Sequence, residues 1–107
     1  MERDAIYTIE EIKEKSRRVF RKSSFVKRAF LFGSYARSEA TTKSDLDFEI
    51  DTDQEVGIEF FGLYDFLQDE FEKNVDVLTS KEVLQLRDRS IGKDKILLYE
   101  RENKDYI

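Results

Sequence analysis

The segment from Ala29 to Asp51, AFLFGSYARSEATTKSDLDFEID, constrains this chain more than any other part of its sequence. An apolar run ends at Gly33-Ser34, ten residues follow, and a second run opens with Asp45-Leu46-Asp47. We interpret the Gly-Ser step as a turn that can hold phosphate, and the two aspartates as a pair that can bind metal. A phosphate-holding turn that faces a carboxylate pair is typical of an enzyme, so we predict that the chain is one.

The second run predicts a strand. Leu46, Phe48 and Ile50 alternate with acidic residues, which indicates one face in the core and one acidic face. Asp45 and Asp47 would leave the same face, roughly 6.6 Å apart along the backbone, where two carboxylates can bridge one cation or hold two about 3.5–4 Å apart. The simpler interpretation is a solvated strand face, because two charges about 7 Å apart in water repel by only about 0.6 kcal/mol. For the aspartate pair alone, the solvated face is favoured.

Gly33 and Ser34 also have a simple interpretation, because a glycine that ends a strand usually marks a turn. In functional terms, free backbone amides at the glycine and a serine hydroxyl at the start of a short helix, expected over 34–39, form an anion site. Arg37 and Lys43 are candidates to neutralise phosphate charge, although solvated Arg and Lys side chains are commoner.

Three capping boxes and the apolar spacing predict the remaining elements. The expected helices are 9–22, one that follows the box over 52–55 and ends near Lys73, and one opened by the box over 79–82 and closed by Gly92. The expected strands are 26–32, the run from Asp45, 75–78, and a short strand or docked segment over 95–100. Residues 101–107 are expected to be loose. The apolar residues expected on the helices are Ile9, Ile12, Val19, Phe20, Phe60, Leu63, Tyr64, Leu67, Phe71, Val83, Leu84 and Leu86.

This order predicts an α+β fold, a small mixed sheet with helices packed on it, in a single domain spanning residues 1–107. Only a short turn region separates the first two strands, so they are expected to be antiparallel. The helix between the second and third strands suits a parallel crossover. Gly33, Asp45, Asp47 and Asp76 then all reach one edge of the sheet. This convergence supports a shared site more strongly than any one motif does.

The absence of two residue types narrows the chemistry. The chain has no Cys and no His, which excludes disulfides, thiolate nucleophiles, zinc–thiolate sites, Ser-His-Asp triads and imidazole ligands. Catalysis would rest on carboxylates, hydroxyls, Lys and Arg. Oxygen-only ligands favour a hard cation such as Mg²⁺.

The net charge of −5 is unevenly distributed. Residues 15–28 contain seven basic and no acidic residues, which indicates a solvated helix face or, alternatively, a partner- or phosphate-binding surface. Residues 44–76 contain twelve acidic residues and one basic residue, Lys73. An acidic chain binds nucleic-acid backbone poorly, so we expect metal ions or a basic protein partner rather than direct nucleic-acid binding. No apolar run approaches the roughly 18 residues of a membrane span and no signal peptide is visible, so a cytoplasmic location is expected.

The combined motifs resemble a known superfamily. Gly-Ser, ten residues, Asp-x-Asp and a lone strand aspartate about thirty residues later are similar to the nucleotidyltransferases that include DNA polymerase β. More closely, GSYARSEATTKSDLD resembles the minimal nucleotidyltransferase (MNT) family. The resemblance covers essentially the whole chain. Members typically have glycine where this chain has Ser38, a position without a catalytic role.

By this resemblance, Asp45, Asp47 and Asp76 would ligate two Mg²⁺ ions, and Asp76 would accept the proton of the attacking hydroxyl. Gly33 and Ser34 would hold the β and γ phosphates of ATP. The implied reaction moves AMP from ATP to a hydroxyl and releases pyrophosphate. Such chemistry needs positioning and charge neutralisation more than a special nucleophile, in keeping with the residues available.

The resemblance also implies an acceptor. Family members that modify antibiotics carry an extra acceptor-binding domain, for which 107 residues leave no room. Small MNT proteins are similar to antitoxins paired with HEPN-domain ribonuclease toxins, in which a toxin tyrosine is adenylylated. We therefore expect a protein adenylyltransferase that acts as an antitoxin on a HEPN-type partner. The alternatives are an antitoxin that acts by binding alone and a nucleotidyltransferase for a small-molecule hydroxyl. The sequence leaves the oligomeric state open.

Overall fold

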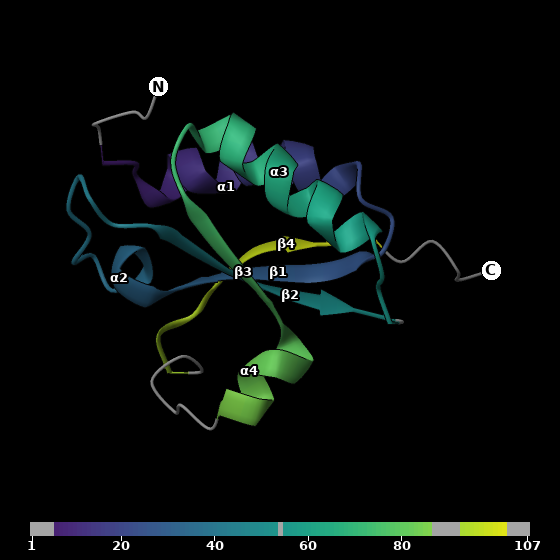
Figure 1. Cartoon of the computed structure of the whole chain (residues 1–107). Helices are drawn as coiled ribbons and strands as arrows, with labels where there is room; N and C mark the ends of the chain where they lie inside the picture. The colour runs from purple at the N-terminus through teal and green to yellow at the C-terminus, as the bar shows by residue number, and fades with distance from the viewer. Residues whose placement is uncertain (1–5, 54, 87–92, 103–107) are drawn as a thin grey trace.

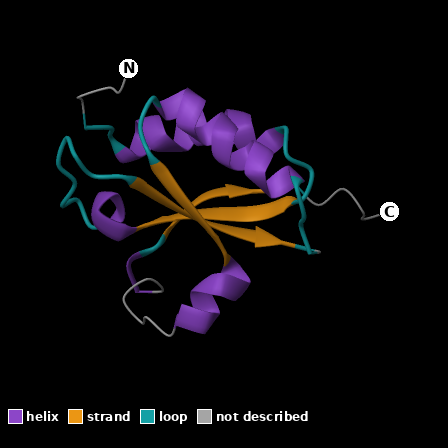
Figure 2. Cartoon of the chain, in the orientation of Figure 1, coloured by secondary structure: helices purple, strands orange, loops and turns teal. Residues whose placement is uncertain are grey.

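The computed structural model describes residues 6–53, 55–86 and 93–102. The strands form one sheet in the order β3-β2-β1-β4. Helices α1 and α3 lie side by side on one face of this sheet, α4 lies against the other face, and the short α2 stands at one end (Figures 1 and 2). No helix in these three segments is long and apolar enough to cross a membrane. In chain order, the elements are α1 (Ile9–Arg21), β1 (Val26–Phe32), α2 (Gly33–Ala36), β2 (Leu46–Thr52), α3 (Glu59–Phe71), β3 (Val75–Thr79), α4 (Ser80–Leu86) and β4 (Ile96–Glu100).

The strand pairings confirm the predicted mixed sheet. β1 runs antiparallel to β2 and to β4, and β2 runs parallel to β3 with α3 as the crossover helix. Phe32 at the end of β1 pairs with Asp47 near the start of β2, and Asp47 pairs with Asp76 near the start of β3. The three strands therefore bring these positions to the same side of the sheet, where β1 ends and β2 and β3 begin. We call this side the carboxylate edge.

The core lies between the sheet and the helices α1 and α3. Phe20 and Phe71 flank Phe48, with ring centroids 6.0 and 5.8 Å from that of Phe48. Burying one such side chain stabilises a fold by about 1.5–3 kcal/mol. Strand β2 is thus fixed through one face, which leaves its other face for Asp47. The buried members of the predicted apolar pattern are Ile12, Val19, Phe20, Leu46, Phe48, Ile50, Leu63, Leu67 and Phe71.

Two of the three predicted capping boxes are confirmed. At α1, the Glu11 backbone donates to Thr8 Oγ1 at 3.1 Å, and the Thr8 backbone donates to Glu11 Oε1 at 2.9 Å. The same reciprocal pair joins Thr79 and Glu82 at the start of α4, at 3.0 and 3.1 Å. Each pair satisfies backbone N–H groups that have no partner within their helix.

The capping box predicted over 52–55 is wrong. Thr52 is the last residue of β2, and α3 begins at Glu59, where no side chain caps the helix. The Asp53 carboxylate instead accepts a hydrogen bond of 2.5 Å from the Arg101 guanidinium, which lowers the pKa of Asp53. Residue 54 lies outside the described residues. The local pattern thus does not form a cap, because Thr52 belongs to β2 and Asp53 forms an ion pair with the distant Arg101.

Arg101 corrects a second expectation, that the chain is loose from residue 101 onward. Its backbone N–H donates to the Lys27 carbonyl at 2.8 Å, and its guanidinium donates to the Ser24 carbonyl at 3.0 Å. The predicted terminal strand is confirmed as β4, and it continues into this anchored residue. Residues 103–107, and the helix end predicted at Gly92, lie outside the described residues.

Helix α4 lies against the second face of the sheet, with a polar contact from its first residue, Ser80. Leu84 and Leu86, expected on the apolar stripe of this helix, are 79% and 56% exposed. Ser80 donates to Glu49 Oε2 at 2.8 Å, and Lys95 Nζ lies 3.3 Å from the same oxygen. Glu49 is only 2% exposed, so the predicted acidic face of β2 is solvated only in part.

Candidate active site

Gly33 directly follows the last residue of β1 and lies against the start of β2. This residue opens α2 with a φ of +76°, a conformation that residues with side chains rarely adopt. A Cβ atom here would lie 2.1 Å from Asp47 Oδ2 and 2.9 Å from Asp47 Cγ. Since no side chain fits in that space, the backbone of the predicted turn lies directly against the carboxylate of a predicted metal ligand. This contact joins the two sequence motifs in one site.

Asp47 and Asp76 form the centre of the site. They are register partners on the parallel strands β2 and β3, with Asp47 half-buried and Asp76 exposed. Burial, followed by the charge and a hydrogen bond of Asp76, raises the pKa of Asp47 to about 7. The charge of Asp45 adds to this rise, and the Arg37 guanidinium opposes it. The Asp47 carboxyl group therefore exchanges a proton near neutral pH.

Asp45 lies slightly apart from the other two carboxylates. It precedes the first residue of β2, Leu46, and is exposed. Contrary to the prediction, Asp45 therefore does not lie on the strand. Its charge nevertheless acts on Asp47. Among the described residues, no three acidic side chains are gathered closely enough to hold a metal ion. The structure thus unites two of the three predicted ligands and leaves Asp45 beside them.

The residues at the carboxylate edge fit a hard divalent cation. The donors are all carboxylate oxygens, a type of ligand that Mg²⁺ prefers. Burial of Asp47 and its repulsion by Asp76 together raise the pKa of Asp47, and either a proton or a cation between the carboxylates relieves this repulsion. The site therefore has the donor chemistry, though not a preformed three-carboxylate cage, for such an ion.

The predicted phosphate-binding residues lie on two segments beside this edge. Ser34 follows Gly33 in the first turn of α2. Arg37 ends that helix, and its charge acts on Asp47. Lys43 is exposed in the loop before β2, and the contact described for it, from its backbone N–H, does not involve the carboxylates. The fold therefore brings Gly33, Ser34 and Arg37 to the site, and the phosphate-binding roles of these three residues and of Lys43 stay predictions.

Two further residues have notable structural features: Lys73, which lies outside the sequence motif, and Ser38, which lies within it. Lys73 is 7% exposed, and its Nζ donates to the Thr42 carbonyl at 3.1 Å, which ties the end of α3 to the loop that carries Lys43 and Asp45. Its one signal in the sequence is that it is the sole basic residue of the acidic stretch over 44–76. Ser38 has a φ of +60°, a conformation that favours glycine, and is therefore strained.

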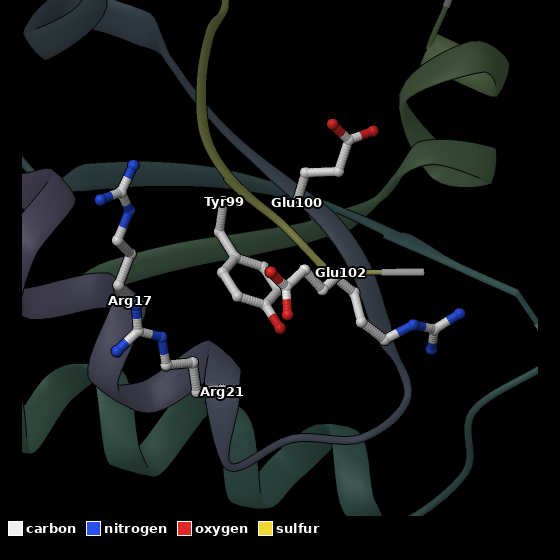
Figure 3. A pocket seen from close by; sticks show the side chains of 6 residues that line it. Arg17, Arg21, Tyr99, Glu100 and Glu102 are labelled. Atoms are coloured by element: carbon white, nitrogen blue, oxygen red, sulfur yellow. The ribbon is translucent and has the colours of Figure 1, made fainter. Parts of the chain in front are cut away.

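A cleft of about 540 Å³ lies at the opposite end of the sheet. Figure 3 shows two arginines of α1 beside the Tyr99 ring in this cleft. On β1, the cleft lies near Arg28, which pairs with Glu100, whereas the carboxylate edge lies at Phe32. The basic end of α1 therefore does not neutralise charge at the carboxylate edge. The lining residues are Arg17, Arg21, Tyr99, Glu100, Arg101 and Glu102.

Comparison with known proteins extends this description. Residues 14–104 match the family described as polymerase beta, nucleotidyltransferase. Two relatives from Methanocaldococcus jannaschii are named "Putative protein adenylyltransferase MJ0128" and "Putative protein adenylyltransferase MJ1379". The first is 37% identical over 75 residues, covering 66% of this chain and 76% of the relative. The second is 34% identical over 82 residues, covering 71% of this chain and 82% of the relative.

Solved structures confirm the fold. A chain of a toxin–antitoxin complex with AMP-PNP superimposes with a TM-score of 0.71 at 16% identity, covering 84% of this chain and 74% of that chain. A chain of the complex between tri-AMPylated Shewanella oneidensis HEPN toxin and its MNT antitoxin gives a TM-score of 0.63 at 15% identity, covering 83% and 70%. Because the family match spans most of the sequence and two relatives exceed 30% identity, this chain belongs to the polymerase beta nucleotidyltransferase family.

Proposed function

We propose that this nucleotidyltransferase moves AMP from ATP, with Mg²⁺, to a hydroxyl group of a partner protein. The observation that carries the proposal is the contact of the Gly33 backbone with the Asp47 carboxylate, which is paired in turn with Asp76. A phosphate chain held at Gly33 would lie beside both carboxylates. Phosphoryl transfer needs such positioning and charge neutralisation. The relatives named as protein adenylyltransferases support AMP as the group and protein as the acceptor.

The phosphates would be held by the turn between β1 and α2. Gly33 offers its backbone N–H and Ser34 its hydroxyl to the β and γ phosphates. Arg37, whose charge already reaches Asp47, would offset phosphate charge from the end of α2. Lys43 would do the same from the loop before β2. These groups orient the triphosphate so that its α phosphorus faces the acceptor.

The carboxylates would hold Mg²⁺ and move the proton. Asp45, Asp47 and Asp76 would bind Mg²⁺, which when bound supplies charge neutralisation at the phosphates. The acceptor oxygen forms a bond to the α phosphorus, and the bond from this phosphorus to the oxygen that bridges to the β phosphorus breaks. Pyrophosphate leaves with that electron pair. The proton of the acceptor hydroxyl passes to Asp76, which is exposed at the edge and so open to a partner.

The acceptor that we propose is a tyrosine of a HEPN-type ribonuclease toxin, with this chain as the antitoxin. The fold is shared with chains of toxin–antitoxin complexes, one of which contains a tri-AMPylated HEPN toxin. The twelve acidic residues over 44–76 also suit a basic, RNA-cleaving partner.

The test is transfer of radiolabel from ATP to a purified HEPN-type toxin. Label in the α phosphate should enter the toxin in the presence of Mg²⁺, and label in the γ phosphate should not. Asp47→Asn should abolish transfer, whereas Glu14→Gln, which removes an exposed carboxylate on α1, should not change it. Transfer of γ label would reveal a kinase, and tight binding of the toxin without transfer of either label would reveal an antitoxin that acts by contact alone.

A further inference from the structure

Helix α3 and the residue that precedes it, Ile58, expose three large apolar side chains. Ile58, Phe61 and Phe66 are 83%, 71% and 61% exposed, although the opposite side of the helix carries the buried Leu63 and Leu67. One exposed apolar residue is ordinary, whereas several on one helix side indicate an interaction surface. Figure 1 shows α3 on the outside of the sheet next to α1, so this side of the helix faces away from the fold.

These residues lie in two adjacent rows. Residues four apart on a helix are neighbours, so Ile58, Gly62 and Phe66 form one row. Phe61, together with the exposed aspartates 65 and 69, forms the next. A Cβ atom added at Gly62 would meet nothing within 4 Å. The row therefore has a gap at its centre, between two large side chains. We call this surface, made of Ile58, Phe61, Gly62, Asp65, Phe66 and Asp69, the α3 outer face.

Gly62 has no explanation within the fold. Glycine is the least favourable residue after proline in a helix interior. Its usual justifications are a positive φ or close packing, and neither applies to Gly62, since open space surrounds it. Its lack of a side chain is instead explained if a side chain of another molecule enters the gap between Ile58 and Phe66.

The charges around this face indicate which kind of partner can bind to it. α3 carries four acidic residues, Glu59, Asp65, Asp69 and Glu70, and no Lys or Arg. The ion pair described for α3 joins Glu70 to Arg18 of α1 at 4.0 Å, and Arg18 also pairs with Glu14. A second copy of this chain would bring like charges together at the contact. A protein with basic residues around a protruding apolar side chain is complementary.

We propose that the α3 outer face is the docking surface for the acceptor protein, a partner with a basic surface and an apolar side chain that enters the gap at Gly62. This inference rests on the proposed function, since it names where the acceptor binds. From Phe61 to the end of α3 at Phe71 the helix rises by about 15 Å. β3, which starts soon after at Val75, carries Asp76 on the carboxylate edge. A partner that lies along α3 can therefore place a loop or terminus at that edge.

The test measures binding of a purified HEPN-type toxin by titration calorimetry, together with AMP transfer. The double variant Phe61→Ser/Phe66→Ser should weaken binding by about thirtyfold or more. The control Leu84→Ser, which removes an exposed apolar side chain on α4 instead, should bind the toxin as the wild type does. Asp65→Lys/Asp69→Lys should also weaken binding, and more so at low salt.

The variant Gly62→Ala separates docking from folding. It should raise the melting temperature, because alanine favours the helix, yet weaken toxin binding at least several-fold, because its methyl group fills the gap. A merely structural role for Gly62 would leave binding unchanged. Wild-type affinity in both Phe61→Ser/Phe66→Ser and Gly62→Ala would overturn the proposal. A wild-type dimer in sedimentation that these variants dissociate would also overturn it, in favour of a second copy as the occupant.

The docking surface and the proposed reaction can be tested independently of each other. Asp47→Asn should bind the toxin with wild-type affinity and fail only in transfer. If the wild type binds the toxin through the α3 outer face but transfers no AMP, the docking surface stands and the proposed reaction fails. If AMP transfer and binding both survive the loss of Phe61 and Phe66, the reaction stands and the docking surface fails.

Discussion

Replacing Gly33 with alanine should disturb the fold and the site together. A φ of +76° costs a residue with a side chain about 1–2 kcal/mol. The new Cβ would lie 2.1 Å from Asp47 Oδ2, so the carboxylate must leave its rotamer at a cost of about 0.5–1.5 kcal/mol. Restriction of the unfolded chain offsets about 0.4–1 kcal/mol of this. We expect a net loss of about 2 kcal/mol in the free energy of unfolding, which lowers Tm by roughly 8–16 °C.

The assay combines thermal unfolding with ATP binding in the presence of Mg²⁺. Gly62→Ala is the matched control, because its Cβ meets nothing within 4 Å and should stabilise α3 by about 0.5–1 kcal/mol without affecting ATP binding. Gly33→Ala should weaken ATP binding because the Asp47 carboxylate is displaced. If Gly33→Ala instead kept the wild-type Tm and bound ATP normally, Gly33 and Asp47 would not be in contact in solution, and this reasoning would be refuted.

Three other predictions follow from the site. In metal-free buffer the wild type should lose stability as pH rises from about 4 to 7, because the unfolded chain releases the Asp47 proton near 3.8 while the folded protein, with a pKa of about 7, retains it. Asp47→Asn should remove this pH dependence, and its free energy of unfolding at pH 8 should exceed that of the wild type by about 1–2 kcal/mol. A rise of about three pKa units corresponds to roughly 4 kcal/mol, which half-burial and solvent screening reduce. Equal Tm values of the two proteins at pH 8 would contradict this. Ser38→Gly should raise Tm by a few degrees, about 0.5–1 kcal/mol, because it relieves a φ of +60°; an unchanged or lower Tm would show that no strain is relieved. Lys73→Met should keep Tm within a few degrees but lower transfer about tenfold, because methionine fills the buried space without donating to the Thr42 carbonyl; a large fall in Tm with normal transfer would make Lys73 purely structural.

Much of the fold was predictable because local patterns and connection lengths agree. The strict alternation of Leu46, Phe48 and Ile50 specifies which face of β2 is buried, and the structure buries all three. The short connection after Phe32 and the helix before Val75 specify antiparallel and parallel pairing, as observed. Those pairings bring the end of β1 and the starts of β2 and β3 to one edge, so the location of the candidate site followed from topology.

What the sequence did not predict depends on contacts between distant residues. Asp53 belongs to a local capping pattern, but its carboxylate binds Arg101, 48 residues away. The same holds for Lys73, whose hydrogen bond to Thr42 spans 31 residues. The fit of Gly33 against Asp47 likewise depends on the register of β1 with β2, which a one-residue slip would abolish.

The most direct test of the central claim is the intact mass of a HEPN-type toxin after incubation with this protein, Mg²⁺ and ATP. We predict a gain of one or more whole AMP units, located on a tyrosine by peptide mapping. The gain should disappear when Mg²⁺ is chelated and when Asp47→Asn replaces the wild type. An unchanged toxin mass under conditions in which the wild type binds both ATP and the toxin would contradict the claim that the carboxylate edge transfers nucleotides to this partner.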